Sequence, residues 1–170
     1  MASLEFKNQM VPQEIQDCVK ESVRATFSMI LGSEPAENEN QDKIGGAGVV
    51  GTISFVGDIT WLLMLELPKQ SAITFSNKFC GFEIDYDSPD MGDAVGELAN
   101  VLAGDIVGRL SRAGIKVGMS LPTIMRGTNV EPILPKDVAK TQIGFTSPGG
   151  DFLIKLAGSR DGYHGRKPGT

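Results

Sequence analysis

The chain has 170 residues, which is enough for one domain with a sizeable hydrophobic core. Its 41% hydrophobic and 22% charged residues are ordinary for a globular protein. The net charge of −5 disfavours nucleic-acid binding, and no apolar run is long enough to cross a bilayer. The first ten residues are polar and lack the apolar core of a signal peptide. We therefore expect a cytoplasmic protein that binds neither nucleic acid nor membrane.

The sequence offers few of the usual catalytic or metal-binding residues. Cys18 and Cys80 lie far apart and neither belongs to a CxxC pair, so we expect both to be small buried hydrophobic side chains. The single histidine, His164, lies close to the C-terminus, which disfavours a Ser-His or Cys-His nucleophile pair. Acidic residues are spread out rather than clustered at metal-ligand spacings. We expect no metal site in this chain, and any catalysis would rest on carboxylates and amides.

The first predicted element is a helix over residues 12–31. Apolar residues recur along it at helical spacing, Pro12 suits its first turn, and Gly32 suits a left-handed cap at its end. The next stretch, residues 32–42, is acidic and has no large apolar residue. This composition predicts an exposed loop.

Residues 44–67 predict a β-hairpin that turns at Gly57-Asp58. The second strand is apolar at nearly every position, which indicates burial on both faces. The start of the hairpin carries four glycines, at Gly45, Gly46, Gly48 and Gly51. No Lys-Ser/Thr pair and no helix start follow them, which excludes a phosphate-binding loop. We expect a strand edge or a bulge there.

The second half of the chain alternates helices and strands. The local signals predict a helix over 69–80, a long helix over 90–113, a strand over 115–121, a turn-rich connection over 123–135, and a second hairpin from 138–145 and 151–156. This order favours an α+β fold in which helices pack on a mostly antiparallel sheet. We assign one domain to residues 1–157 and a disordered tail to residues 158–170, which are glycine-rich and basic.

The long helix over 90–113 has two distinct faces. Its apolar residues recur at steps of three and four and form a stripe. Nearly opposite that stripe lie Asp93, Glu97, Asn100 and Gly104. Glycines in a helix interior lower its stability by roughly 0.8–1 kcal/mol each relative to alanine. The glycines of this helix therefore indicate close packing or a closely approaching partner.

Glu97 and Asn100 are three residues apart and project from the same side of the helix. A carboxylate can bind a lysine ammonium, and a primary amide can both donate to and accept from one water molecule. On spacing alone, an ordinary polar helix face is the favoured explanation of the pair, because polar residues are normal on the solvent side of a helix. Asp105 and Arg109, spaced i and i+4, favour a structural ion pair.

The run DAVGELANVLAGD at 93–105, followed by LPTIMRG at 121–127, resembles the CheC/CheX/FliY family of chemotaxis phosphatases. The family pattern of acid or serine, glutamate, asparagine and a later proline matches Asp93, Glu97, Asn100 and Pro122, with a final gap one residue shorter. A single such motif and the short chain are similar to the CheX branch. The resemblance covers most of residues 10–157.

The resemblance implies a phosphatase that acts on the aspartyl phosphate of a CheY-like response regulator. It implies that Glu97 binds a lysine of the regulator and that Asn100 orients the attacking water. Asp93, Gly104 and Pro122 would contact the partner. The Mg²⁺ of the reaction would belong to the regulator, so this chain would need no cofactor. The family also implies a homodimer formed by pairing of sheets. A non-catalytic adaptor that binds a signalling or flagellar protein through the same helix face is the alternative.

Overall fold

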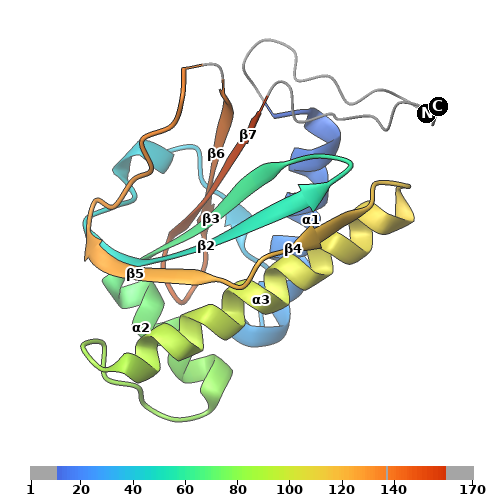
Figure 1. Ribbon diagram of the computed structural model, residues 1–170. Helices are drawn as coiled ribbons and strands as arrows, with labels where there is room; N and C mark the ends of the chain where they lie inside the picture. The colour runs from blue at the N-terminus through green and yellow to red at the C-terminus, as the bar shows by residue number, and fades with distance from the viewer. Residues whose placement is uncertain (1–10, 137, 160–170) are drawn as a thin grey trace, which may run out of the picture.

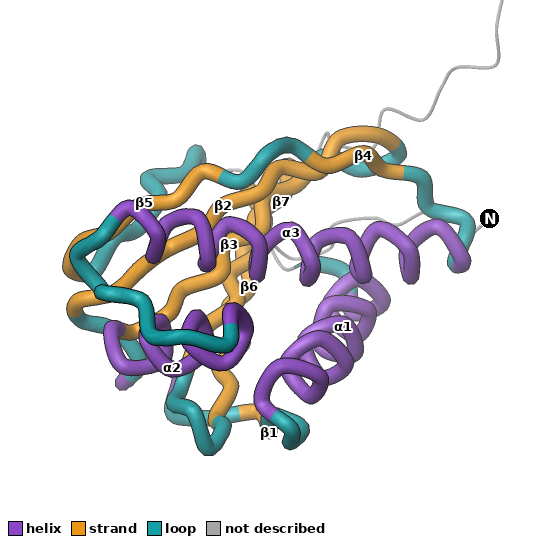
Figure 2. Tube along the Cα trace, turned by 90° about the horizontal axis from the view of Figure 1, so that it is seen from below, coloured by secondary structure: helices purple, strands orange, loops and turns teal. Residues whose placement is uncertain are grey.

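The computed structural model describes residues 11–136 and 138–159. In these residues, helices cover one face of a seven-stranded antiparallel sheet (Figures 1 and 2). In chain order the elements are α1 (Gln13–Leu31), β1 (Ala36–Glu37), η2 (Gln41–Lys43), β2 (Ala47–Gly57), β3 (Trp61–Pro68), α2 (Lys69–Cys80), α3 (Pro89–Arg112), β4 (Val117–Met119), β5 (Thr123–Thr128), β6 (Val138–Thr146) and β7 (Phe152–Ser159). The predicted α+β class, with helices on an antiparallel sheet, is confirmed.

The strands follow the order β1-β6-β7-β3-β2-β4, and β5 pairs with β2 beside β4. The two predicted hairpins, β2–β3 and β6–β7, lie at the centre of the sheet and pair with each other through β3 and β7. Because β3 has a strand on each side and is covered on both faces, nearly all its side chains are buried, as its continuous apolar sequence predicted.

The glycines at the start of β2 have a different role from the predicted edge or bulge. Strand β2 is paired on both sides, with β3 on one and with β4 and β5 on the other. Gly51 lies directly under α3, and a Cβ atom there would come within 3.2 Å of Ile124 and 3.4 Å of Ala99. A side chain at Gly48 would collide with the backbone carbonyl of Leu67. The small residues therefore let the helix and the neighbouring strand approach β2.

The structure corrects two predicted loops. Residues 123–135 are not a turn-rich connection throughout, because Thr123–Thr128 forms β5 and pairs with Thr52 to Ala47 of β2. The acidic loop 32–42 contains the two-residue strand β1 and the short helix η2. Both strands depend on partners far along the chain, which local sequence signals do not reveal.

A layer of aromatic and aliphatic side chains between the helices and the sheet forms the core. Phe27 of α1, Phe75 of α2 and Phe152 of β7 contact one another, with ring centroids 4.6–5.4 Å apart. Cys18 and Cys80 border this core and are half-buried rather than fully buried, which corrects the prediction for both.

The structure describes only the first two residues of the predicted C-terminal tail. Strand β7 continues to Ser159, so the residues at 158 and 159, predicted to begin the tail, belong to the sheet. The rest of the predicted tail, 160–170, lies outside the described residues, as does His164. Among the helices of the described chain, none combines the length and the apolar character needed to cross a membrane.

Candidate functional site

Helix α3 presents the two faces that its sequence predicted. Ten of its residues are buried against the sheet and the other helices, at Met91, Ala94, Val95, Gly96, Leu98, Ala99, Leu102, Ala103, Ile106 and Leu110. The helix begins after Ser88, with Pro89 in its first turn, and Gly114 follows its end with φ 84°. This burial of one stripe fixes which side chains of α3 face solvent.

The predicted site residues gather on the solvent face of α3. Asp93, Glu97 and Gly104 are exposed, and Asn100 is half-buried. No lysine or arginine of the described residues lies within 4.0 Å of either carboxylate. Within the described chain, the carboxamide of Asn100 also makes no hydrogen bond to a protein group. The face therefore offers a carboxylate and an amide whose hydrogen-bonding capacity is unused.

Such a pair can bind a cation and hold a water, but it is not a metal site. Within the described ranges, no group of three histidine, cysteine, aspartate or glutamate side chains is arranged to hold a metal ion. A lone carboxylate next to an amide can bind an ammonium group and orient one water molecule. Any further catalytic group would have to come from the substrate or from a partner.

Pro122 packs against α3 beside this face. Its Cγ atom lies 3.7 Å from the position of a Cβ built on Gly96, the residue that precedes Glu97. Two residues further along the same stretch, Ile124 approaches Gly92 to 4.0 Å by the same measure. Ile124 also lies 3.7 Å from the Cβ position at Gly96, so Pro122 and Ile124 both line this side of α3. The structure thus brings Pro122 next to Glu97 and Asn100.

Arg126 continues this row and holds the start of α3. Its guanidinium donates hydrogen bonds to the carbonyl oxygens of Tyr86 at 2.9 Å, Asp87 at 3.2 Å and Ser88 at 3.3 Å. Ser88 is the residue before the first turn of the helix. This role of Arg126 was not predicted from the sequence. The alternation of Pro122, Ile124 and Arg126 at steps of two was the available signal for a strand whose alternate residues face one side.

The glycines of α3 are not all explained by packing. At Gly96 an added Cβ would make ordinary contacts of 3.7–3.9 Å, so alanine would fit there. Among the described residues, an added Cβ at Gly104 would meet nothing within 4 Å, and one at Gly108 would meet only the end of the Arg112 side chain at 3.8 Å. Packing within this chain therefore does not require glycine at 104, which leaves a closely approaching partner as the prediction for that position.

Asp105 and Arg109 form the predicted structural pair. Nε of Arg109 lies 2.7 Å from the Asp105 carboxylate, and a second guanidinium nitrogen lies 3.2 Å from Glu21 of α1. Burial alone would raise the pKa of Asp105, but the hydrogen bond from Arg109 and the nearby positive charges lower it overall. The pair joins α3 to α1 and lies outside the predicted site.

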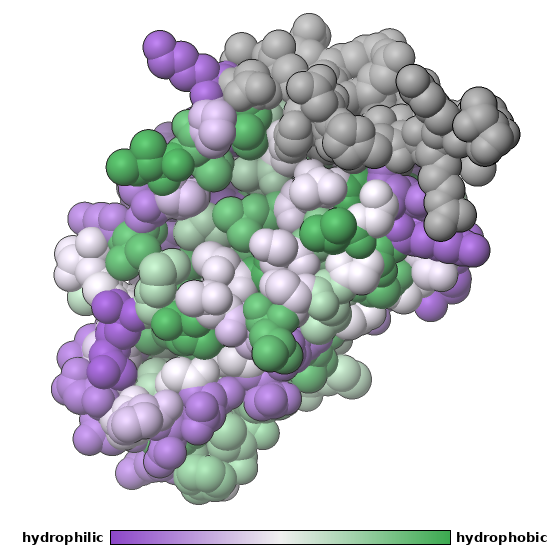
Figure 3. Space-filling view, in the orientation of Figure 1, coloured by the Kyte–Doolittle hydropathy of each residue, from purple (hydrophilic) through white to green (hydrophobic). Residues whose placement is uncertain are grey.

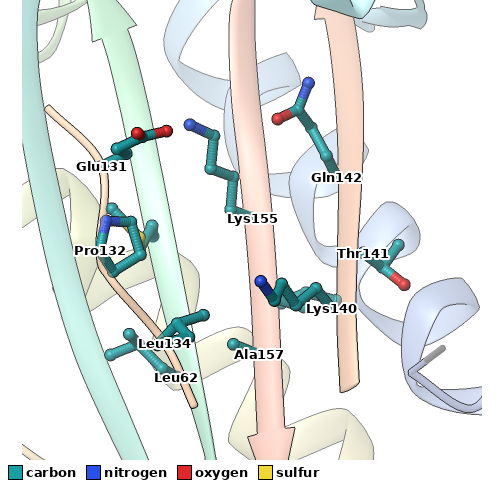
Figure 4. Close-up of a pocket in the computed structure, with 11 residues that line it drawn as sticks. Leu62, Glu131, Pro132, Leu134, Lys140, Thr141, Gln142, Lys155 and Ala157 are labelled. Carbon is teal, nitrogen blue, oxygen red and sulfur yellow. The ribbon is translucent and has the colours of Figure 1, made fainter. Parts of the chain in front are cut away.

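A cavity of the described structure lies away from α3. It measures about 390 Å³ and opens on the sheet face opposite the helices, between β3, β6, β7 and the segment that follows β5 (Figure 4). Figure 4 shows Glu131 and Lys155 pointing toward one another at its rim, and Lys155 also lies 2.7 Å from the buried Glu66. None of the predicted site residues lines this cavity. The exposed site on α3 therefore has the form of a docking surface rather than a pocket.

Comparison with protein families identifies the chain. The family model described as "Chemotaxis phosphatase CheX" matches residues 49–146, more than half of the sequence, including all of α3 and Pro122. The chain belongs to the CheX family. This match confirms the resemblance that the motif in α3 suggested, and it makes the protein a member of a family of chemotaxis phosphatases.

Solved CheX structures share the fold. The chemotaxis protein CheX from Vibrio vulnificus is 18% identical and superposes with a TM-score of 0.73 over 84% of this chain and 97% of its own. CheX from Desulfovibrio desulfuricans is 22% identical, with a TM-score of 0.72 over 84% and 97%. In the CheX–CheY–BeF3–Mg²⁺ complex from Borrelia burgdorferi, the matched chain is 17% identical, with a TM-score of 0.65 over 85% and 96%. No curated protein sequence matches this chain.

Proposed function

We propose that this protein hydrolyses the aspartyl phosphate of a CheY-like response regulator by placing α3 in the regulator's phosphorylation site. The main support is the solvent face of α3, where Glu97 and Asn100 lie one turn apart with no protein partner among the described residues. Membership of the CheX family and the CheX–CheY complex from Borrelia burgdorferi add to it. The carboxylate and the amide suit a reaction that requires positioning more than a covalent nucleophile.

In the proposed reaction, Glu97 and Asn100 have separate roles. The Glu97 carboxylate binds the ammonium of a lysine in the regulator and so aligns the two proteins. The Asn100 carboxamide accepts a hydrogen bond from one water molecule and orients it in line with the phosphorus. The water attacks phosphorus, the bond between phosphorus and the aspartyl oxygen breaks, and inorganic phosphate and a free carboxylate result. Mg²⁺ held by the regulator would neutralise charge on the phosphoryl oxygens.

Asp93, Gly104 and Pro122 surround this pair and complete the proposed docking surface. Asp93 adds a second exposed carboxylate one turn before Glu97, which suits a positively charged part of the partner. Gly104 leaves open space one turn beyond Asn100. Pro122 is half-buried against α3 and gives the surface a rigid border.

We also propose a homodimer formed through an open edge of the sheet. Strand β1 pairs only with Thr146 and Phe145 of β6. In the described residues, no strand pairs with the same edge of β6 from Val138 to Ile143. An unpaired edge of this length can pair with a strand of a second copy. Sedimentation equilibrium tests this proposal, which predicts twice the mass of the chain and is contradicted by a monomer at micromolar concentration.

The test of the function is phosphate release from phosphorylated response regulators with and without the protein. The proposal predicts turnover of many regulator molecules per molecule of protein, and Glu97→Ala should weaken both binding and turnover. Binding in a fixed ratio without faster phosphate release would favour the alternative, a non-catalytic adaptor. Absence of binding to every regulator of the organism would contradict both.

A further inference from the structure

Two exposed apolar side chains flank the Glu97–Asn100 pair. Val101 follows Asn100 on α3 and is 36% exposed, and Leu121 precedes Pro122 and is 85% exposed. We call Val101 and Leu121 the apolar rim. On the face shown in Figure 3, apolar residues stand among polar ones rather than forming one continuous patch. Single exposed apolar residues are common, so the position of this pair beside the site carries the argument.

Leu121 adjoins Pro122, which packs against α3. Pro122 lies against Gly96, which is one residue before Glu97 and one helical turn before Asn100. Adjacent Cα atoms are about 3.8 Å apart, so the backbone of Leu121 also lies at this level of the helix. Its side chain is almost fully exposed to solvent. Helical geometry puts Val101 on the side of the pair opposite Gly96, so Val101 and the chain at Leu121 lie on opposite sides of Glu97 and Asn100.

We propose that the apolar rim binds apolar side chains of the phosphorylated regulator on either side of its phosphorylation site, and that these contacts select among regulators. The proposal rests on the proposed function. The centre of the surface carries the unpaired acids Glu97 and Asp93, which suit a cationic centre in the partner. A partner that fits both the acidic centre and the apolar rim has a lysine bordered by apolar residues. Charged or polar residues of the partner at that border would weaken binding, because contact with the rim would remove the water that hydrates them.

The rim and the pair should contribute differently to the kinetics. Contacts made equally in the bound complex and in the transition state lower KM without changing kcat. The rim touches neither the phosphoryl group nor the water in the proposed reaction, so it should act in this way. Asn100 acts on the water and should change kcat. A role for Leu121 in folding alone would change neither constant of the folded protein.

The experiment compares Leu121→Ser and Val101→Ser with Met29→Ser, a matched control. Met29 is 77% exposed on α1 and lies outside the surface. Losing the apolar contact should raise KM for the phosphorylated regulator, and Kd for the regulator loaded with BeF3⁻ and Mg²⁺, by roughly five- to tenfold. The kcat should stay within twofold of wild type, and Met29→Ser should change nothing. Unchanged KM and Kd in both rim variants, or an equal rise in the control, would overturn the proposal.

The outcomes separate the rim from the proposed function. If the wild-type protein binds a regulator without accelerating phosphate release, the catalytic function is wrong, and the Kd comparison still decides the role of the rim. If catalysis is present and the rim variants keep wild-type KM and Kd, only the rim is wrong. If the wild-type protein binds no regulator, both proposals are wrong.

Discussion

Replacing Gly104 with alanine should stabilise α3 and at the same time weaken the binding of a partner. Gly104 lies inside α3, it is exposed, and a Cβ atom there would meet no atom of the described residues within 4 Å. Alanine should therefore stabilise the fold by about 0.8–1 kcal/mol, the usual difference between glycine and alanine in a helix interior. For a domain of this size the midpoint of thermal unfolding should rise by roughly 2–4 °C. If a partner approaches Gly104 closely, the same methyl group should weaken binding.

The assay pairs thermal unfolding with the Kd for a regulator loaded with BeF3⁻ and Mg²⁺. Gly108→Ala is the control, because its Cβ would meet only the flexible end of Arg112, one turn further from Asn100. We expect both variants to be stabilised, and only Gly104→Ala to bind at least severalfold more weakly. A stabilised Gly104→Ala that binds as tightly as wild type would refute the close approach at Gly104. If Gly104→Ala is no more stable than wild type, the space around position 104 is not open as described.

Three further predictions concern the support of the site. Arg126→Met removes three hydrogen bonds to carbonyl groups before α3. The free energy of unfolding should therefore fall by about 1 kcal/mol, and the backbone amides of the first turn of α3 should exchange hydrogen with solvent faster. Unchanged amide exchange would contradict the role of Arg126. The folded state lowers the pKa of Asp105, so its ionised form stabilises the fold above its ordinary pKa and this contribution is lost as pH falls through the lowered value. Asp105→Asn should therefore lower the denaturation midpoint at pH 7 and converge with wild type in strong acid, whereas an equal loss at every pH would contradict the ion pair. Burial raises the pKa of Cys18 to about 11, so alkylation at pH 8 should be much slower in the native protein than in urea, and equal rates would contradict this.

Periodicity predicted the parts of the fold that depend on local sequence. The stripe and the opposite face of α3 were predicted correctly, because a helix of 24 residues repeats its pattern many times. The β2–β3 hairpin was predicted from its β-branched residues and its turn. For these elements, local propensity and the final packing agree.

Pairing between distant parts of the chain could not be predicted in the same way. Strand β5 is six residues long and includes arginine and glycine, and its pairing with β2 determines its conformation. The role of Gly51 depends on α3 crossing over it, which no local pattern shows. Arg126 was missed for the same reason, since its hydrogen-bond partners lie 38–40 residues earlier in the chain.

The candidate site was predicted in part. Helical geometry predicts that Asp93, Glu97, Asn100 and Gly104 share one face, and in the structure this face is exposed except at Asn100, which is half-buried. The family motif made Pro122 a candidate partner-binding residue, and its contact with α3 became evident only from the structure. That Glu97 and Asn100 lack protein partners among the described residues became evident only from the structure. Their roles in binding and catalysis stay predictions.

Single-turnover phosphate release with Asn100→Ala tests the central claim most directly. At saturating protein, the rate of phosphate release from the phosphorylated regulator should fall about 100-fold, which corresponds to about 2.7 kcal/mol of transition-state stabilisation. Affinity for the regulator loaded with BeF3⁻ and Mg²⁺ should stay within a few fold of wild type, and Asn40→Ala, an exposed asparagine remote from α3, should behave as wild type. A wild-type rate in Asn100→Ala would show that this amide does not position the attacking water.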